Sequence, residues 1–327
     1  MNCNRNLLRI IYTLIFFVGC FSVAYAQRPS KKKNESMTAV VPKVKASNQL
    51  TREIQSYLNG KQKIGVAIEF LPYSEYKDQY KKENLTVNIH GNDTFPTMSV
   101  AKFPLAIYAL MLVEGGKLTL DQPILIDSND LSLQTYSPTT KDKTAPFSIT
   151  LREAIESSVG LSDNVTTDKI LDVVGGPKAV TDFYRALNFP KILIGTKYRD
   201  MNKTGIYANA CTPNEMNRLL FEFYYGLITK PEHSIWLYGI MKNSPTGQNR
   251  LKKYLPEGTE VAHKTGSNYN DEKPEMVKTA NDVGYIKMKQ GLLMISVFVH
   301  SQESYYTCED IIATIANKAY GYYSESN

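Results

Sequence analysis

Two residues at the head of an apolar stretch have types and spacing that could do chemistry. Ser99 and Lys102 stand three positions apart, so a helix there would place both side chains on one face. A serine hydroxyl is a weak nucleophile at neutral pH, and a lysine amine can take its proton if burial lowers the pKa of that amine. The alternative is structural, with a serine that caps the helix and a lysine whose stem lies along it. Spacing alone does not decide, because Ser30 and Lys33 repeat it in a basic stretch.

A second polar group lies between two predicted helices. Ser162, Asp163 and Asn164 follow a predicted helix over 150–159 and precede another over 164–174. A hydroxyl here could relay a proton to a leaving group, and an amide could bind a substrate amide and orient the lysine. The alternative is a turn followed by a helix cap, since all three residue types favour both.

A third group ends a predicted strand. Residues 264–267 read KTGS and close a strand expected over 259–265. A lysine and hydroxyls at a strand end can hold a carboxylate, and a glycine lets a substrate backbone approach closely. The alternative is an exposed strand end that turns at the glycine. The letters KTG recur at 203–205, but in a predicted loop with no strand before them.

The elements that must position these groups predict an α+β fold. An antiparallel sheet flanked by terminal helices is expected to receive an all-α lobe between its early and late strands, with a site in the crevice between the lobes. Apolar alternation predicts strands over 63–70, 84–90, 259–265, 281–288 and 292–300. Helical periodicity predicts helices over 48–59, 99–113, 150–159, 164–174, 177–187, 213–228, 231–243 and 307–322. The expected catalytic domain is 47–327, with a sheet lobe over 47–98 and 258–327 and a helical lobe over about 99–257.

The three groups together, in this order and these contexts, resemble the motif set of the class A serine β-lactamases and the related penicillin-binding proteins. The likeness runs from about residue 50 to about residue 322. The stretches FPTMSVAKF, LSDN, TGQNRL and VAHKTGS are most similar to the class A branch of Bacteroidetes-type bacteria. The resemblance implies a β-lactamase/transpeptidase-like fold, hydrolysis of β-lactam antibiotics through a covalent acyl-enzyme, and no cofactor.

The resemblance also implies a role for each residue. Ser99 attacks the lactam carbonyl, Lys102 takes or relays its proton, and Ser162 passes a proton to the departing nitrogen. The backbone N–H groups of Ser99 and Ser267 would form an oxyanion hole, typically worth about 3 kcal/mol per donor. The implied substrate-binding residues are Asn164 for the side-chain amide, Lys264, Thr265, Gly266 and Ser267 for the carboxylate, Arg250 in support of that carboxylate, and Tyr136 at the pocket mouth. For Tyr136 the alternative is an ordinary loop tyrosine.

One residue that the resemblance implies is missing. A glutamate that activates the hydrolytic water should follow Asn164 by about 35 residues, near 196–198, yet no glutamate occurs over 157–214. Asp200 is the closest acid, 36 residues after Asn164, and is the candidate substitute base although its side chain is one methylene shorter. Acylation can proceed without this residue, whereas water attack on the acyl-enzyme then lacks its base.

Three functions therefore stay open. The protein hydrolyses β-lactams, with Asp200 or another route replacing the glutamate; or it is a cell-wall D,D-peptidase or acyl-transfer enzyme that β-lactams trap; or it acylates and stalls as a non-turnover β-lactam-binding protein. The likeness to class A favours the first, and the missing glutamate favours the others. Two measurements distinguish these functions. One compares continued turnover with a single stoichiometric burst, and the other tests cleavage of D-Ala-D-Ala peptides. Preference between penicillins and cephalosporins stays open.

The N-terminus predicts export. Residues 1–26 combine Arg5 and Arg9, an apolar core and a small-x-small cleavage site, as secretory signal peptides do. This favours a periplasmic location, with lipid anchoring at Cys20 as the alternative. The apolar run is short for a stable membrane span. Residues 27–46 predict a flexible basic linker.

Composition excludes other classes of function. The formal net charge is +6 and the expected folded part has no basic stripe, so nucleic acid is not an expected partner. The four histidines stand singly, and no His/Cys cluster has metal-ligand spacing, so no metal is expected. Cys211 and Cys308 remain after signal removal, and their pairing is open. We expect a monomer whose partner is a small-molecule β-lactam.

Overall fold

The computed structural model describes residues 48–58, 63–132, 135–269 and 275–325. The predicted signal peptide over 1–26 and the predicted linker over 27–46 lie outside these residues. Within the described ranges, no helix combines the length and the apolarity that crossing a bilayer requires.

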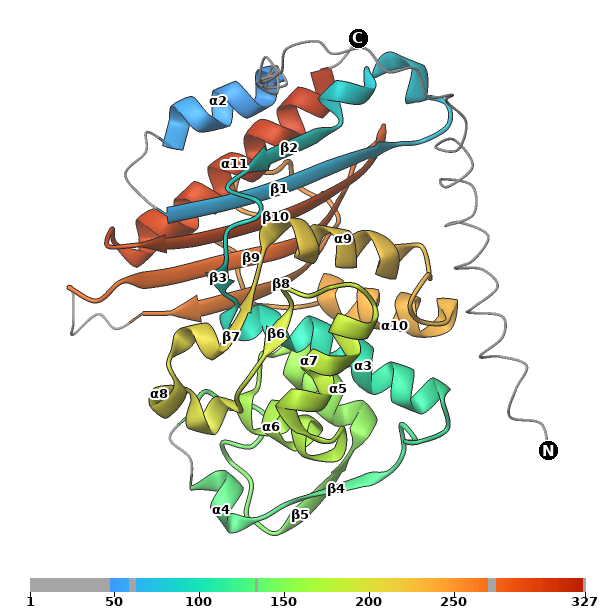
Figure 1. The fold of residues 1–327 in the computed structure, drawn as a ribbon, viewed down its shortest axis with the longest axis vertical. Helices are drawn as coiled ribbons and strands as arrows, with labels where there is room; N and C mark the ends of the chain where they lie inside the picture. The colour runs from blue at the N-terminus through green and yellow to red at the C-terminus, as the bar shows by residue number, and fades with distance from the viewer. Residues whose placement is uncertain (1–47, 59–62, 133–134, 270–274, 326–327) are drawn as a thin grey trace, which may run out of the picture. The chain divides into compact units, whose positions relative to one another are not determined.

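An antiparallel sheet drawn from both ends of the described chain is the centre of the fold (Figure 1). Its strand order is β2-β1-β10-β9-β8. The strands are β1 Lys63–Pro72, β2 Thr86–Ile89, β8 Val261–Asn268, β9 Lys278–Lys287 and β10 Gly291–Ser301. Apolar alternation predicts all five, and the expected α+β class is confirmed.

The central strand β10 divides the interior into two cores. Its odd-numbered residues from 293 to 299 pack with α2 (Gln49–Leu58) and α11 (Tyr305–Glu325). Its even-numbered apolar residues from 292 to 298 pack in the core that contains α9 (Pro213–Tyr224). Because successive side chains of a strand point to opposite faces, a strand that is apolar on both faces needs helices on both.

Two helices that the sequence assigns to the helical lobe pack on the sheet instead. Helix α9 lies against β1 and β10, and α10 (Pro231–Lys242) lies against β8. The reason is the apolar face of α9, whose Leu219 and Phe223 are buried in one core with sheet residues. The Tyr285 hydroxyl of β9 also donates to the Leu220 carbonyl at 2.8 Å. The segment 213–242 is therefore a covering layer of the sheet.

The remaining helices surround one buried helix. Helix α3 (Lys102–Glu114) follows a 3₁₀ turn, η3 (Met98–Ala101), so the predicted helix begins with a tighter turn. Helix α5 begins with a capping box between Thr150 and Glu153. The helices in contact with α3 are α5 Leu151–Gly160, α6 Asn164–Val173 and α7 Gly176–Ala186. The segment between α3 and α5 forms the hairpin of β4 Pro123–Ile126 and β5 Phe147–Thr150, with α4 Ser128–Leu131 between these strands.

A segment of short elements between α7 and α9 lies beside η3. Strand β7 pairs with β3 (Phe95–Pro96), which leads directly into η3. The segment consists of β6 Leu193–Ile194, η4 Tyr198–Asp200, α8 Met201–Thr204, η5 Ile206–Ala208 and β7 Asn209–Cys211. Elements of two to four residues carry too little periodicity to be read from sequence, so the sequence analysis does not predict them.

Candidate active site

Ser99 is half-buried in the η3 turn, which directly precedes α3. Its neighbour Met98 has a positive φ of 48°, a conformation that a residue with a side chain rarely adopts. The chain therefore turns sharply out of β3 and presents the serine at the head of a buried helix. The predicted helix-start position of Ser99 is a 3₁₀ turn that continues as that helix.

Lys102 joins the first two motifs. Its side chain is fully buried, and its Nζ donates to the Ser162 carbonyl and to Asn164 Oδ1, both at 2.6 Å. The Ser162 hydroxyl lies 3.4 Å from the same Nζ. Burial first, then the positive charge of Lys264, holds the Lys102 pKa well below its ordinary value, against the opposing pull of nearby aspartates. An amine that loses its proton this readily can act as a base.

Ser162 links this lysine to the third motif. Its hydroxyl accepts from Lys264 Nζ at 3.0 Å and so lies between the two amines. The backbone of Ser162 has a φ of 61°, a left-handed conformation that stores strain in a residue with a Cβ. Asp163 follows as the N-cap of α6, accepting from the Thr166 N–H at 2.9 Å. The turn-and-cap alternative is thus true of Asp163, while Ser162 and Asn164 face the lysines.

Lys264 is the second buried amine. It is fully buried on β8 and also donates to the Thr265 carbonyl at 3.0 Å. Burial lowers its pKa to about 7, although the charge of Asp282 opposes the shift. Arg250 adds a further lowering through charge repulsion. A group with this pKa is partly charged near neutrality, so its hold on a carboxylate depends on pH.

Gly266 lets the strand end approach the nucleophile. A Cβ added there would lie 2.4 Å from the Thr97 carbonyl oxygen and 3.1 Å from the Ser99 nitrogen. Asn281 of β9 fixes the same approach by donating to the Pro96 carbonyl at 2.8 Å. The backbone N–H of Ser99 therefore lies beside the strand end that carries Ser267, the arrangement that an oxyanion hole requires.

Arg250 lies behind this strand end. Its guanidinium is buried and donates to the Gly266 carbonyl at 3.1 Å and to the Ser267 hydroxyl. Glu309 of α11 holds its Nε at 3.0 Å. The Tyr305 hydroxyl accepts from Arg250 and donates to the Ser267 hydroxyl at 2.7 Å. Arg250 is predicted from the stretch TGQNRL, whereas Tyr305, at the start of α11, belongs to no motif and is not predicted.

Thr246 is a second residue that the sequence analysis does not single out. Its hydroxyl lies 3.0 Å from that of Thr265 and 2.9 Å from that of Ser244. Thr246 opens the quoted stretch TGQNRL, so the signal was present in the motif that contains Arg250.

Tyr136 meets the site through its backbone. Its carbonyl accepts from the Asn164 N–H at 2.9 Å, and its side chain is 61% exposed. Thr135 beside it accepts from the Asn164 side-chain amide at 2.7 Å. The loop around 135–136 thus holds Asn164, and the role of the Tyr136 ring at a pocket mouth stays a prediction.

Asp200 is not brought to the nucleophile. Its carboxylate pairs with Lys203 at 3.3 Å, and that lysine side chain is 81% exposed. No described contact joins Asp200 to Ser99 or Lys102. Its type and its spacing after Asn164 suggested a base, but its described partner is this exposed lysine.

Tyr198 lies at the nucleophile instead. Its hydroxyl donates to the carbonyl of Met98, the residue directly before Ser99, at 2.9 Å. Lys102 Nζ is 4.5 Å from the centre of its ring. Burial raises the Tyr198 pKa above its ordinary value, so the phenol keeps its proton at neutral pH. Tyr198 begins η4 and stands in the window where the missing glutamate is expected.

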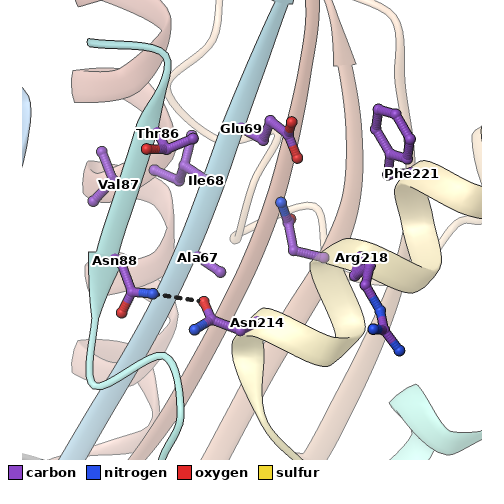
Figure 2. Close-up of a pocket in the computed structure, with 10 residues that line it drawn as sticks. Ala67, Ile68, Glu69, Thr86, Val87, Asn88, Asn214, Arg218 and Phe221 are labelled. Carbon is purple, nitrogen blue, oxygen red and sulfur yellow. Dashed lines mark hydrogen bonds between the residues drawn. The ribbon is translucent and has the colours of Figure 1, made fainter. Parts of the chain in front are cut away.

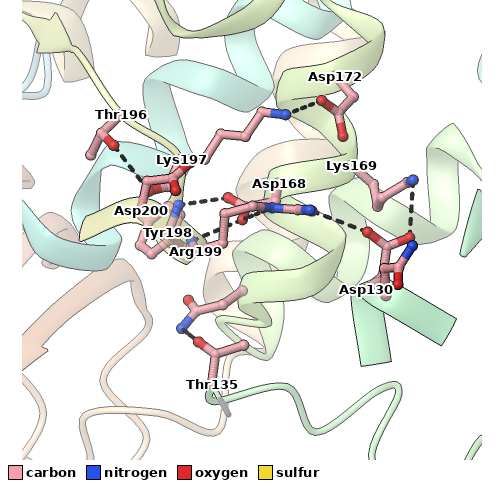
Figure 3. Close-up of polar contacts among 12 residues, drawn as sticks. Asp130, Thr135, Asp168, Lys169, Asp172, Thr196, Lys197, Tyr198, Arg199 and Asp200 are labelled. Carbon is pink, nitrogen blue, oxygen red and sulfur yellow. Dashed lines mark hydrogen bonds and ion pairs between the residues drawn. The ribbon is translucent and has the colours of Figure 1, made fainter. Parts of the chain in front are cut away.

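Asp168 fixes Tyr198 in this position (Figure 3). Its carboxylate accepts from the backbone N–H of Tyr198 at 2.7 Å and from that of Arg199 at 3.0 Å. Arg199 also reaches Asp130 at 3.1 Å, and Asp130 in turn accepts from Lys169. A network of charged groups on α4 and α6 therefore holds the backbone of the loop.

A separate pocket of about 360 Å³ opens between β1, β2 and α9 (Figure 2). Asn88 donates to Asn214 across it at 2.9 Å. Glu69 and Arg218 also line it, and its lining contains none of the site residues that the sequence predicts.

Comparisons with known proteins agree with this arrangement. A family model described as the β-lactamase enzyme family matches residues 47–323. The chain belongs to this family. The β-lactamase VEB-1 from Pseudomonas aeruginosa is 36% identical over 286 residues, which cover 85% of this chain and 91% of the relative. A β-lactamase from Bacteroides uniformis is 33% identical over 292 residues, which cover 86% and 94%.

Solved structures give the same result for this β-lactamase. A class A β-lactamase from Bacteroides cellulosilyticus has a TM-score of 0.74 and 29% identity, covering 83% of this chain and 96% of its own. PBP-A has a TM-score of 0.71 at 21% identity and supports the fold alone. The expected class A membership, fold and serine β-lactam hydrolase activity are confirmed, and the D,D-peptidase alternative is not favoured over them.

Proposed function

We propose that Ser99 is the nucleophile with which this β-lactamase opens the lactam ring, and that Lys102 is its base. The observation that carries the proposal is the set of contacts around Lys102, a fully buried amine held by the Ser162 carbonyl and Asn164 Oδ1. Burial lowers its pKa well below the ordinary value, which favours the neutral amine that can accept the serine proton.

The acylation step balances within these groups. As Ser99 Oγ bonds to the lactam carbonyl carbon, its proton passes to Lys102, and the carbonyl oxygen becomes an anion beside the N–H groups of Ser99 and Ser267. Collapse of that intermediate breaks the lactam C–N bond. Ser162 then gives its proton to the departing nitrogen and regains one from a neighbouring lysine. This route is supported by the position of the Ser162 hydroxyl between both amines.

Substrate recognition uses the opposite wall. Lys264, Thr265 and Ser267 are proposed to bind the carboxylate of the β-lactam, with the buried charge of Arg250 behind them. Asn164 donates to the substrate side-chain amide through the nitrogen that otherwise reaches Thr135. Gly266 leaves room for the substrate along the strand end.

The first experiment follows mass and turnover together. The full chain, expressed with its own N-terminus and purified, is mixed with excess nitrocefin while hydrolysis and intact mass are recorded. We expect turnover that Ser99→Ala abolishes and that the matched Ser30→Ala variant, with the same S-x-x-K spacing, retains. Absence of both turnover and a covalent adduct in the wild type would remove Ser99 as nucleophile.

We also propose that residues 1–26 direct export to the periplasm, and that the exported protein is monomeric. The support is the sequence pattern of a charged start, an apolar core and a cleavage site. Osmotic shock should release an unlipidated protein that lacks these residues. Incorporation of a labelled fatty acid that Cys20→Ser prevents would support the lipid-anchored alternative instead. Light scattering of the released protein tests the monomer.

A further inference from the structure

Hydrolysis needs a second proton transfer, which rests on the proposed function. Once Ser99 is acylated, a water oxygen must bond to the acyl carbon while its proton passes to a base; the Ser99 Oγ–carbon bond then breaks and the serine regains a proton. The groups that face Ser99 therefore decide how long the acyl-enzyme lasts.

The nearby carboxylates are already committed to backbone groups. Both oxygens of Asp163 accept N–H groups, from Thr166 and from Thr139, each at 2.9 Å. Both oxygens of Asp168 accept N–H groups of η4, and one also accepts Arg199 Nε at 3.1 Å. A carboxylate that holds two backbone donors in place has a structural role and is not free to approach a water.

The loop that contains η4 places the aromatic side chain of Tyr198 where a carboxylate could act as the base for water. Because Asp168 fixes the backbone at Tyr198, the side chain of that residue is directed to Lys102 and to the Met98 carbonyl, next to Ser99. Its hydroxyl is used as a donor to the Met98 carbonyl, and its ring lies over the lysine amine. A phenol whose pKa is raised cannot take a proton from water at neutral pH.

We propose that Tyr198 occupies the position of the deacylation base without supplying one, so that removal of the acyl group from Ser99 is the slow step of the reaction. Among the described residues, Lys102 is then the base left in contact with this part of the site. The enzyme acylates at the rate set by Lys102 and releases product much more slowly.

The wild-type protein tests this directly. The full chain is mixed with excess benzylpenicillin and quenched in acid at increasing times. The mass of the intact protein is then measured at each time. We expect about one equivalent of adduct with the full mass of the substrate, because ring opening by Ser99 loses no atoms. Adduct decay should match the steady-state rate of hydrolysis. If no adduct accumulates while Ser99-dependent turnover is fast, the inference is overturned and the proposed function stands. If neither adduct nor turnover occurs, the proposed function itself fails.

Three variants test the base. Tyr198→Glu supplies a carboxylate and is expected to speed adduct decay roughly 10²-fold, at the lower end of what a positioned general base contributes. Glutamine has nearly the same size as glutamate but is not a base, so Tyr198→Gln controls for the space that loss of the tyrosine ring opens for water. Tyr207→Glu makes the same change elsewhere in the loop, where the ring contacts Lys63.

The outcomes separate chemistry from space. Faster decay in Tyr198→Glu that declines as pH falls through the carboxylate pKa, with little gain in Tyr198→Gln, supports the inference. Equal gains in Tyr198→Glu and Tyr198→Gln overturn it, because space and not a base was then missing. An equal gain in Tyr207→Glu overturns it as well. The burst amplitude of each variant reports whether it still folds and acylates. The adduct lifetime of the wild-type protein tests the inference even if the variants do not fold.

Discussion

At the scale of single residues, the site is made of two buried amines that share one serine hydroxyl. Lys102 and Lys264 are each removed from water, and the Ser162 hydroxyl lies between them. Burial penalises their charged forms, and each sits beside the other's charge or that of an arginine. The chemistry therefore responds to pH near neutrality.

Substrate binding should weaken with rising pH. The Lys264 pKa is lowered to about 7, so the amine is charged below that pH and neutral above it. We expect the dissociation constant of the non-covalent complex with a carboxylate-bearing penicillin to rise about tenfold or more from about pH 6 to about pH 9. The dependence of the acylation rate on substrate concentration measures it across this range. Lys264→Arg, whose charge persists, should flatten the profile, and a flat wild-type profile would contradict the assignment.

The backbone at Ser162 should be strained. Its φ of 61° is easily adopted by glycine and unfavourable with a Cβ. Both Ser162→Gly and Ser162→Ala should lose activity, but the glycine variant should be more stable by about 1 kcal/mol. Denaturant unfolding measures the difference. At Ser157, inside α5, the same pair should show the opposite order, since glycine weakens a helix interior. If the alanine variant is the more stable one at both positions, the backbone at Ser162 is not strained.

Most residues of the site could be predicted from the sequence, because the motifs consist of specific residue types at fixed spacings. It brought Ser99, Lys102, Ser162, Asn164 and the 264–267 group into one expected site, and the structure brings them together. It selected Asp200 as the acid closest to the expected spacing after Asn164. Spacing did point to the window 196–198, but it could not show that Asp168 binds two backbone N–H groups of η4 and so places the Tyr198 side chain beside Lys102.

At the scale of elements, strands and long helices were predictable and the short elements were not. The five strands of the sheet alternate over enough residues to be recognised. The segment from β6 to β7 is held by contacts between its own two ends, such as the Asn209 amide oxygen of β7, which accepts the Gly195 N–H at 2.9 Å. The apolar face of α9 was visible in sequence, but which surface it would cover was not.

The contact between β8 and η3 should tolerate no side chain at position 266. Gly266→Ala would place a Cβ against the Thr97 carbonyl and the Ser99 nitrogen, so the strand end must move away. We expect the acylation rate to fall about 10²- to 10³-fold, the effect of losing one oxyanion donor. Stopped-flow mixing with nitrocefin measures it.

The matched control is Gly321→Ala. No atom lies within 4 Å of an added Cβ there, and the residue is inside α11. This change should leave acylation unaltered and stabilise the protein by roughly 0.5–1 kcal/mol. Equal acylation by the Gly266→Ala and wild-type proteins would show that the close approach is not needed.

At the scale of the whole described chain, each of the two cores contains one free cysteine. Cys211 of β7 lies in the core shared with α3, and Cys308 of α11 lies in the core beneath α2 and α11. Both thiols are unpaired and buried. The sheet between the cores contributes side chains to each, so we expect the cores to unfold together.

The thiols report on this cooperativity. Burial raises the pKa of both, that of Cys308 to about 11, so neither should react with a thiol reagent in the native state. With increasing denaturant, both should become reactive at one midpoint, which peptide mass mapping after pulse labelling can assign. Two separated midpoints would show that the cores unfold independently.

The packing at one edge of the sheet affects the tendency of the protein to aggregate at high concentration. Strand β8 pairs with β9 on one side alone, and an uncovered strand edge is a template on which other chains can aggregate. Its residues Val261–Gly266 are buried, with α10 and η3 packed against the strand. The nucleophile turn that meets Gly266 is therefore part of the packing that buries this edge strand. Substitutions that loosen the turn should then promote self-association as well as loss of activity.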